Sequence, residues 1–512
     1  MIKKLPSNHE KAEEFVNMFS EISRLEGLST HCQNLRKNEE RKHAHQDPLS
    51  DNSHYLNANI TANEITEAIR SLSNKQTSVG LDAISNEMLK HLPERCTHIL
   101  QKLFQMCWNS GKMLQLWKKS IVIPILKQGK PRQDKTSYRP IALTSHVCKL
   151  MEKIILKRLM HYCDKNSIIP INQAGFQKGK SAIDHLVKLT TQIKRQFARR
   201  KNVLATFFDV KKAYDQVWHY RLLQKLKSIG LSGHIYDYLK CFISNRSIQT
   251  RIGTSYSSSR TLEMGIPQGS VIAPILFTIL LQDLPKLLSK DVILAQYADD
   301  ICLWMNVTLK KSTPLRSIKY IQKVYQNELN KLCHYLSENG MTLSVEKTHM
   351  MLFNSGNNPE KLPVFKIEDK IVIYKDTVKF LGVYLTPKLS WNIHIENILT
   401  KARKSLNLLK VIAKQPWGMD TQCLIHLSTS LVRSKLSYGQ EVFFSAPKYL
   451  LKKLQSLDCK AYKIALGVPF HTSSTDTYNE VGILPLEEHR KLASAKYILR
   501  SSTVETYSKR RN

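Results

Sequence analysis

The sequence predicts an α+β fold, because it combines a strand hairpin and further short strands with several long helical patterns. Two apolar runs, 292–295 and 301–305, flank a tight turn and are typical of a β-hairpin. A strand is also predicted over Val203–Asp209, and another over 121–125, where it leads into a basic loop. The chain has 512 residues, of which 42% are hydrophobic, and this length suits one large multi-part domain or two to four smaller ones.

Helical patterns account for most of the remaining chain. Apolar residues recur at helical spacing over 12–25, 62–69, 85–117, 212–229, 271–284, 317–336, 392–413 and 450–464. The pattern over 85–117 predicts one apolar helix face, formed by Ile99, Leu103, Met106 and Cys107. Gly467 stands where the last helix is expected to end. The polar and charged residues 34–53 are expected to form a linker.

The chain is strongly basic. It contains 77 Lys and Arg against 42 Asp and Glu, which gives a formal net charge of +35 and a pI near 9.7. So large an excess favours a polyanionic partner, most commonly nucleic acid, over a mere surplus for solubility. The basic residues are spread along the chain rather than gathered in one tail, which favours a long binding groove over a membrane-anchoring cluster.

Cysteine usage and hydropathy favour a soluble, intracellular protein. The ten cysteines are scattered, with no CxxC pair and no Cys/His set at zinc-site spacing. The first residues lack the apolar core of a signal peptide, and the longest apolar stretch, 271–281, is too short to span a bilayer. We therefore expect no membrane partner and a location in the nucleus, the cytoplasm or both.

Two adjacent aspartates, Asp299 and Asp300, lie in the turn between the two apolar runs. Carboxylates at a turn are usually solvated, but here apolar residues enclose them on both sides. Like charges in such a place repel one another and lose hydration, and a bound cation offsets both costs. Oxygen-only ligands favour Mg²⁺. The pair therefore indicates a metal-assisted phosphoryl-transfer site.

A third carboxylate, Asp209, ends the apolar strand that begins at Val203. Taken alone, Asp209 is better explained as the N-cap of the helix predicted after it. Beside a hairpin tip that carries Asp299 and Asp300, it would complete a cage of three carboxylates able to hold two Mg²⁺ ions about 3.5–4 Å apart. One ion would activate a 3′-hydroxyl, and the other would hold a triphosphate and stabilise the leaving pyrophosphate.

Three further segments carry candidate ligand-binding residues. Gly265–Ser270 is either an ordinary strand-to-helix turn or a loop against which a flat ligand packs, with Gln268 placed to touch a sugar or base. Lys347 is either a surface residue or a proton donor to pyrophosphate. The basic loop after residue 125 is either a solvated face or a clamp for phosphates. Its basic residues are Lys127, Lys130, Arg132, Lys135 and Arg139.

Eight sequence blocks follow one another in a specific order. They begin at Ser78 (SVGLDAISNEMLK), Tyr138 (YRPIALTS), Asn172 (NQAGFQKGKS), Phe208 (FDVKKAYDQVWH), Gly265 (GIPQGSVIAPILF), Tyr297 (YADD), Leu343 (LSVEKT) and Phe380 (FLGVYL). In this order the chain resembles the reverse transcriptases of non-LTR, LINE-like retrotransposons, and most of all the jockey group. YADD alone is a weak signal, but eight ordered blocks over 78–385 are very specific. The tail also resembles the region after the family's polymerase core, at Leu431–Gly439 and 465–468.

The resemblance implies a right-hand polymerase with fingers, an antiparallel-sheet palm and a helical thumb, plus a helical C-terminal extension. It implies a helical and linker segment over 1–77 and a reverse transcriptase domain over 78–386, with its catalytic core at about 107–386. The thumb would cover 387–416 and the extension 417–512. The implied activity is that of an RNA-directed DNA polymerase, with an RNA template, a DNA primer and dNTPs as partners.

The resemblance also implies the catalytic and metal-binding residues. Asp209, Asp299 and Asp300 would be catalytic. Together with Val210 they would bind two Mg²⁺ ions, with Mn²⁺ as a substitute. Lys347 would be the catalytic lysine that follows the palm hairpin.

Other residues would bind the nucleotide and the duplex by the same resemblance. Tyr214 would be a steric gate against the sugar 2′ position, although its spacing alone favours a core aromatic residue on a helix. Lys127 and Arg139 would hold the triphosphate, and Gln268 would lie near the incoming nucleotide and the template. The thumb helix would present basic residues to a duplex backbone, namely Lys401, Arg403, Lys404 and Lys410.

The sequence departs from the family in a few respects. The first block has Val79 where the family usually has proline. The residues before that block are too few for an endonuclease, and the tail shows no second carboxylate set for an RNase H, so we expect neither activity. The alternative is a truncated, catalytically idle remnant that only binds RNA. An RNA-directed RNA polymerase shares the palm carboxylates, but Tyr214 argues against it.

Overall fold

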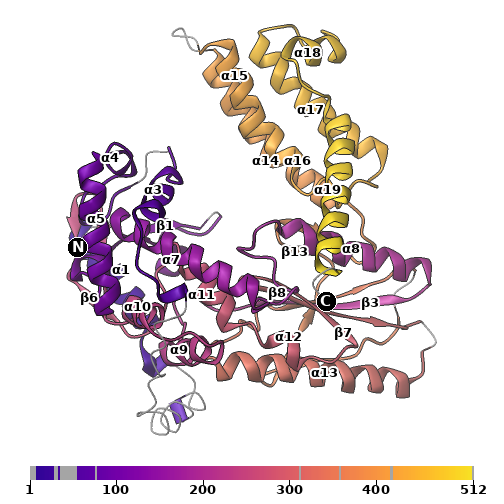
Figure 1. Cartoon of the computed structure of the whole chain (residues 1–512). Coiled ribbons are helices and arrows are strands. Elements are labelled where there is room, and N and C mark those ends of the chain that lie inside the picture. The colour runs from indigo at the N-terminus through magenta and orange to yellow at the C-terminus, as the bar shows by residue number, and fades with distance from the viewer. Residues whose placement is uncertain are drawn as a thin grey trace, which may run out of the picture.

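The computed structural model has the outline of a right hand (Figure 1). It describes residues 7–27, 33–34, 55–74, 78–127, 129–310, 313–356, 359–414 and 419–509. A mixed unit on one side carries the fingers, a sheet with long helices forms the palm, and a helical thumb rises from the palm. The expected α+β fold with fingers, palm and helical thumb is confirmed. Of the predicted linker, residues 35–53 lie outside the described residues.

The palm contains a five-stranded sheet in the order β12-β9-β3-β8-β7. Its strands are β3 (Asn202–Asp209), β7 (Val292–Tyr297), β8 (Asp300–Val307), β9 (His349–Phe353) and β12 (Ile373–Tyr374). Neighbouring strands are antiparallel, except that β12 runs parallel to β9. Because side chains alternate along a strand, the central β3 serves two cores. Leu204 and Phe208 enter one core, and Phe207 enters the other.

Both faces of the palm sheet are covered. On one face, α11 (Ala273–Leu280) and α13 (Leu315–Glu338) share a core with β3 and β8. On the other face lie α8 (Ala182–Ala198) and the hairpin of β13 (Val378–Phe380) and β14 (Val383–Leu385). A sheet buried on both faces explains why its strands read as nearly continuous apolar runs. Polar side chains therefore gather at the strand ends.

The fingers contain a second sheet, in the order β2-β1-β4-β5 with β6 beside β4. Its strands are β1 (Lys119–Leu126), β2 (Tyr138–Leu143), β4 (Arg246–Ile252), β5 (Ser255–Tyr256) and β6 (Arg260–Leu262). Helix α1 (Asn8–Ile22) packs Val16 and Phe19 against Val122 and Ile248 of this sheet. The other helices of this half are α3 (Ala62–Arg70), α4 (Asn86–Lys90), α5 (Glu94–Ser110), α6 (Gln115–Lys118), α7 (His146–Lys165), α9 (His219–Ser228) and α10 (His234–Ile243).

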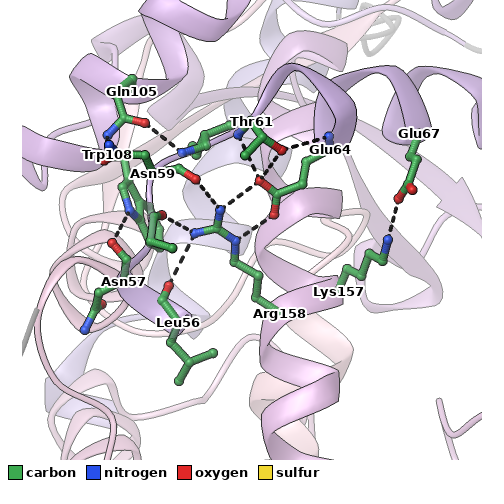
Figure 2. Close-up of polar contacts among 12 residues, drawn as sticks. Leu56, Asn57, Asn59, Thr61, Glu64, Glu67, Gln105, Trp108, Lys157 and Arg158 are labelled. Atoms are coloured by element: carbon green, nitrogen blue, oxygen red, sulfur yellow. Dashed lines mark hydrogen bonds and ion pairs between the residues drawn. The ribbon is translucent and has the colours of Figure 1, made fainter. Parts of the chain in front are cut away.

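Arg158 of α7 joins the segment before α3 to the rest of the fingers (Figure 2). Its Nε and Nη2 atoms donate to the two carboxylate oxygens of Glu64, at 2.8 Å each. Its Nη1 and Nη2 atoms also donate to the carbonyl oxygens of Ala58, at 2.6 Å, and Asn59, at 2.9 Å. The guanidinium lies 5.4 Å from the ring centre of Trp108. One side chain thus satisfies the loop carbonyls and fixes the start of α3, where Glu64 completes a capping box.

Replacing Arg158 by Lys is expected to destabilise the fingers by about 1–2 kcal/mol, because an ammonium group cannot reproduce the two parallel bonds to Glu64. Urea unfolding of the purified chain measures this loss. Lys157 beside it pairs with Glu67 but is largely exposed, so Lys157→Arg serves as the control and should leave the free energy of unfolding unchanged. Equal stability of the Arg158→Lys variant and the wild type would contradict this role.

The thumb and the C-terminal helices form one helical unit (Figure 1). The helices are α14 (Asn392–Ala413), α15 (Thr421–Leu427), the π-helical segment Ser428–Arg433, α16 (Ser434–Ser437), α17 (Lys448–Leu466), α18 (Ser474–Val481) and α19 (Leu486–Lys509). Apolar residues of α14 and α17 belong to the same core. As predicted, Gly467 ends α17 in the left-handed conformation, with φ +69°. Helix α19 returns to the palm, where Arg500 pairs with Asp184 at 2.8 Å.

Two expectations about helices are wrong. In α5, Ile99 and Met106 are 65% and 68% exposed, because the buried face is centred on Phe104 and Trp108 instead. The helix predicted over 212–229 begins only at His219. Before that point the carbonyls of residues 214 and 217 accept hydrogen bonds from another loop, which a continuous helix would not permit.

Other short elements complete the palm side, namely α12 (Leu284–Leu287), β10 (Lys366–Ile367) and β11 (Lys370–Ile371). Within the ranges that the structure describes, nine cysteines are free of disulfides. None of the helices described is both long and apolar enough to cross a bilayer.

Candidate active site

The three predicted carboxylates meet where β3 and the β7–β8 hairpin end. Asp209, the last residue of β3, lies directly opposite Asp300, the first residue of β8. Opposed residues of antiparallel strands project from the same face of the sheet, so these two carboxylates are neighbours. Asp299 lies in the two-residue turn that joins β7 to β8. Like charges so placed destabilise the fold, unless another group compensates for them.

The hairpin turn is held in an unusual conformation by the sequence block that begins at Asn172. Ala298 has φ +56°, in the left-handed region that residues with side chains seldom adopt. The buried Gln173 accepts hydrogen bonds at its Oε1 atom from the backbone N–H of Ala298, at 3.2 Å, and of Gly175, at 2.8 Å. A Cβ atom at Gly175 would lie 2.8 Å from the nitrogen of Ala298, so only glycine permits this approach. The block thereby fixes the carboxylates beside it.

The protonation of the hairpin carboxyls responds to this crowding. Partial loss of hydration raises the pKa of Asp300 to about 6, and the charges of Asp299 and Asp209 contribute further. Loss of hydration also raises the pKa of Asp299, with a smaller contribution from Asp209 that the positive charge of Arg139 opposes. Both shifts express mainly the cost of removing these carboxylates from water, to which the neighbouring negative charges add. A cation at this point would remove that cost.

The donor atoms present fit a magnesium ion that arrives with its substrate. Asp209 and Asp300 offer carboxylate oxygens on one face, and the Val210 carbonyl accepts no hydrogen bond within the described part of the chain. In that same part, no three Asp, Glu, His or Cys side chains are grouped closely enough to hold a metal alone. Mg²⁺ commonly binds to one or two carboxylates and completes its shell with water and substrate phosphates.

Lys347 is held against the same carboxylates by the block that begins at Leu343. This block pairs with the end of β3 through a bridge between Val210 and Leu343. The backbone N–H of Ser344 donates to the carbonyl of Asp209 at 2.8 Å. The Lys347 Nζ atom then lies 3.5 Å from a carboxylate oxygen of Asp209. The structure thus brings this predicted residue to the site, as the cation partner of Asp209.

The basic loop of the fingers reaches the site as well. Lys127 follows β1, and its Nζ atom donates to the carbonyl of Thr136 across the loop at 2.8 Å. Loss of hydration lowers the pKa of Lys127, and the positive charges of Lys347 and Arg139 lower it further. Lys212, which the sequence did not single out, adds to this cluster of positive charge. A group of cations that repel one another beside three carboxylates is suited to a polyanion such as a triphosphate.

Tyr214 lies between the carboxylates and the Gly265 loop. Its ring stacks on Phe277 of α11, with centroids 5.0 Å apart and planes 15° apart. Burial raises the pKa of the Tyr214 hydroxyl, and the charge of Asp299 raises it further, so the two side chains are electrostatic neighbours. The carbonyl of Tyr214 accepts a hydrogen bond from Ile266 at 2.9 Å. The ring is half-buried and lies in a turn, not on the helix predicted for it.

Gln268 is oriented by Asp215, a residue that the sequence alone did not single out. The Gln268 Nε2 atom donates to Asp215 Oδ1 at 2.8 Å. Burial raises the pKa of Asp215 to about 6, against the hydrogen bond from Gln268 and the charge of Lys212. A Cβ atom at Gly265, where φ is +92°, would lie 2.7 Å from the Asp215 carbonyl. The only signal in the sequence was a second aspartate in the block at 208–219.

Glu152 supports the same loop from behind. It is 1% exposed, and its Oε2 atom accepts hydrogen bonds from Ser270 Oγ at 2.6 Å and from the backbone N–H of Val271 at 2.7 Å. A weaker bond comes from the N–H of Ile272 at 3.3 Å. Those amides precede α11, whose dipole favours a negative charge at this end. Glu152 is the single glutamate of segment 146–165, and no pattern in the sequence set it apart.

Comparison with known proteins identifies the family of the chain. The family model described as "Reverse transcriptase (RNA-dependent DNA polymerase)" matches residues 125–385, about half of the chain. A probable RNA-directed DNA polymerase from transposon BS of Drosophila melanogaster is 27% identical over 445 residues, which cover 86% of this chain and 48% of that protein. The RNA-directed DNA polymerase from the mobile element jockey of the same organism is 26% identical over 447 residues, covering 86% and 48%.

A third relative, the probable RNA-directed DNA polymerase from transposon X-element of Drosophila melanogaster, is 26% identical over 444 residues and covers 85% of this chain and 47% of that protein. The chain therefore spans about half the length of the curated relatives it matches. The resemblance to the jockey group of non-LTR retrotransposons is confirmed. The family model covers part of the fingers, the palm and the β13–β14 hairpin, and the chain therefore belongs to the reverse transcriptase (RNA-dependent DNA polymerase) family.

Proposed function

We propose that this chain is an RNA-directed DNA polymerase, which adds dNTPs to the 3′-hydroxyl of a DNA primer on an RNA template. The observation that carries the proposal is the pairing of Asp209 with Asp300, with Asp299 in the adjoining turn and a cluster of cations around them. This arrangement combines donors for divalent metal with groups that bind a triphosphate. Nucleotide addition needs positioning and charge stabilisation rather than covalent help from the protein.

The carboxylates and the Val210 carbonyl would hold two Mg²⁺ ions, for which Mn²⁺ would be a substitute. When bound, these ions would supply activation of the attacking hydroxyl and stabilisation of the leaving pyrophosphate. Asp209 and Asp300 are cross-strand neighbours, so both carboxylates would be able to bind one ion together. Asp299, on the strained turn, adds negative charge at the hairpin tip.

The cations of the site would bind the triphosphate and its leaving group. Lys127 and Arg139 lie on the loop and strand that face the palm, and the fork of Arg139 suits two phosphate oxygens. The Lys347 Nζ atom lies 3.5 Å from a carboxylate oxygen of Asp209. If Asp209 bound a metal ion instead, Lys347 would be able to donate a proton to pyrophosphate. Gln268, fixed by Asp215, would contact the nucleotide's sugar or base.

Replacing Tyr214 by Ala is expected to reduce discrimination against ribonucleotides on the order of 10- to 100-fold, because the ring beside Asp299 would no longer exclude a 2′-hydroxyl. The measurement is kcat/KM for a dNTP and the matching NTP in single-nucleotide extension. Tyr214→Phe is the matched control, since it keeps the ring on Phe277 and should keep the discrimination. Unchanged discrimination in Tyr214→Ala would contradict the role of a steric gate.

The thumb offers a basic surface for the product duplex. On α14 the side chains between the buried positions are exposed, and four of them are cationic: Lys401, Arg403, Lys404 and Lys410. Their spacing along one long helix suits the regular phosphates of a duplex. We expect primer–template binding that weakens steeply as the salt concentration rises.

The proposed function is tested by extension of a DNA primer on an RNA template and on a DNA template of the same sequence, with dNTPs or NTPs. The expected result is magnesium-dependent addition of dNTPs on the RNA template. Synthesis that requires NTPs would contradict the proposal and indicate an RNA polymerase. Synthesis on DNA alone would show that the template assignment is wrong.

A further inference from the structure

A tyrosine outside the family model lies at the edge of the carboxylate site. Tyr438 follows α16 and belongs to the block Leu431–Gly439. This block lies after the residues that the family model matches, and the proposed function assigns no role to it. Its hydroxyl donates a hydrogen bond to the carbonyl of Leu381 at 2.7 Å. Leu381 and Gly382 form the turn of the β13–β14 hairpin, with φ values of +44° and +85°. The thumb unit and the hairpin are therefore joined at one point.

The fit between Tyr438 and this turn is close. A Cβ atom at Gly382 would lie 2.9 Å from Cε1 and 3.3 Å from the hydroxyl of Tyr438, so the ring occupies the place of a side chain. The next residue, Gly439, has φ +74°, and a Cβ atom there would lie 3.2 Å from Val383 Cγ2. Two glycines on opposite sides of the contact thus allow the tyrosine to rest on the turn.

The turn is in contact with the strand that carries Asp209. Phe380, which precedes the turn, packs its ring 5.2 Å from that of Phe207. Phe207 is two residues before Asp209 and projects from the same face of β3. Lys379, which precedes Phe380 in the chain, carries a positive charge that lowers the pKa of Asp300. A displacement of the hairpin would therefore be felt directly beside the carboxylates.

Tyr438 itself is near the reacting end of the site. Burial raises the pKa of the Tyr438 hydroxyl, and the neighbouring Tyr297 and Asp300 raise that pKa further. The residue nevertheless remains 43% exposed, so part of its ring is accessible from solvent. Aromatic rings with one accessible side serve as stacking surfaces for nucleic acid. A primer whose 3′ end lay at Asp300 would have this ring as a neighbour.

We infer that Tyr438 is a positioning residue, which holds the Leu381–Gly382 turn against the carboxylate strands and so fixes the 3′ end of the primer for attack. This inference rests on the proposed polymerase function. It assigns to the helical C-terminal unit a direct part in alignment, in addition to binding the duplex. Misplacement of a reacting group by about 1 Å can cost on the order of 100-fold in rate.

The test is single-nucleotide extension by full-length Tyr438→Phe and Tyr438→Ala variants, with kcat and KM for dNTP and primer–template affinity measured separately. Loss of the hydroxyl alone should lower kcat about three- to tenfold, as expected for one hydrogen bond, and loss of the ring should lower kcat more strongly. The KM for dNTP and the affinity for primer–template should change by less than about twofold, since neither variant touches the triphosphate cations or α14.

Tyr449→Phe is the matched control. Tyr449 is also an exposed tyrosine of the thumb unit, and its hydroxyl bonds to Asn392 at 2.9 Å, away from the turn. It should extend primers as the wild type does. A kcat of Tyr438→Phe equal to that of Tyr449→Phe, or a change confined to primer–template affinity, would overturn the inference. Absence of extension by the wild type would instead overturn the proposed function.

Discussion

Replacing Asp299 and Asp300 together by alanine is expected to lower the rate of nucleotide addition on the order of 10³-fold or more, because the transition-state charge loses its preorganised partners. Single-turnover extension at saturating dNTP and Mg²⁺ measures this loss. Primer–template affinity should persist, since the cations of α14 are untouched. The free energy of unfolding should be equal or higher near pH 7.5, because the raised pKa values of both carboxyls show that their charges oppose the fold at that pH.

Asp291→Ala is the control for this experiment. Asp291 is an exposed aspartate just before β7, at the opposite end of the same hairpin strand. It should retain the wild-type rate. Magnesium-dependent synthesis that survives the loss of both Asp299 and Asp300 would show that the carboxylates are not the catalytic site.

Replacing Glu152 by Ala is expected to destabilise the protein by about 3–5 kcal/mol, since it leaves the buried hydroxyl of Ser270 and the backbone N–H of Val271 without their acceptor. The same change should raise the KM for dNTP, because Ser270 ends the loop that carries Gln268. Urea unfolding and steady-state extension measure the two effects. Glu152→Gln keeps the shape and one acceptor oxygen, so it should lose less stability than the alanine variant.

A matched surface control separates this effect from the loss of a negative charge. Glu480 is exposed on α18, and its replacement by Ala should change the free energy of unfolding by less than about 0.5 kcal/mol. If Glu152→Ala were as stable as Glu480→Ala, the buried glutamate would not be the support of this loop.

The palm carboxylates could be predicted from the sequence because strand alternation and a hairpin are local features. Val203–Asp209 reads as a buried strand, and Asp299 and Asp300 interrupt two apolar runs, so their meeting needs only that the strands pair. Lys347 was found through its block rather than through any periodicity. The structure adds that it is paired with Asp209.

The residues that sequence reasoning missed act through contacts between distant segments. Glu152 and Ser270 are 118 positions apart, and Tyr438 and Leu381 are 57 apart, so neither pair leaves a local pattern. The same physics explains why the helix predicted over 212–229 begins only at His219. Two carbonyls in the turn around Tyr214 bond to the Gly265 loop, and this tertiary contact outweighs a modest helical propensity.

The most direct measurement is incorporation of a single dNTP by the wild-type chain on a DNA primer annealed to RNA, with Mg²⁺, after removal of Mg²⁺ by chelation, and after its restoration. The predicted result is one added nucleotide with Mg²⁺, none after chelation, and renewed addition when Mg²⁺ is returned. Salt-sensitive binding of the primer–template without incorporation in Mg²⁺ or Mn²⁺ would contradict the polymerase function and indicate a chain that only binds RNA.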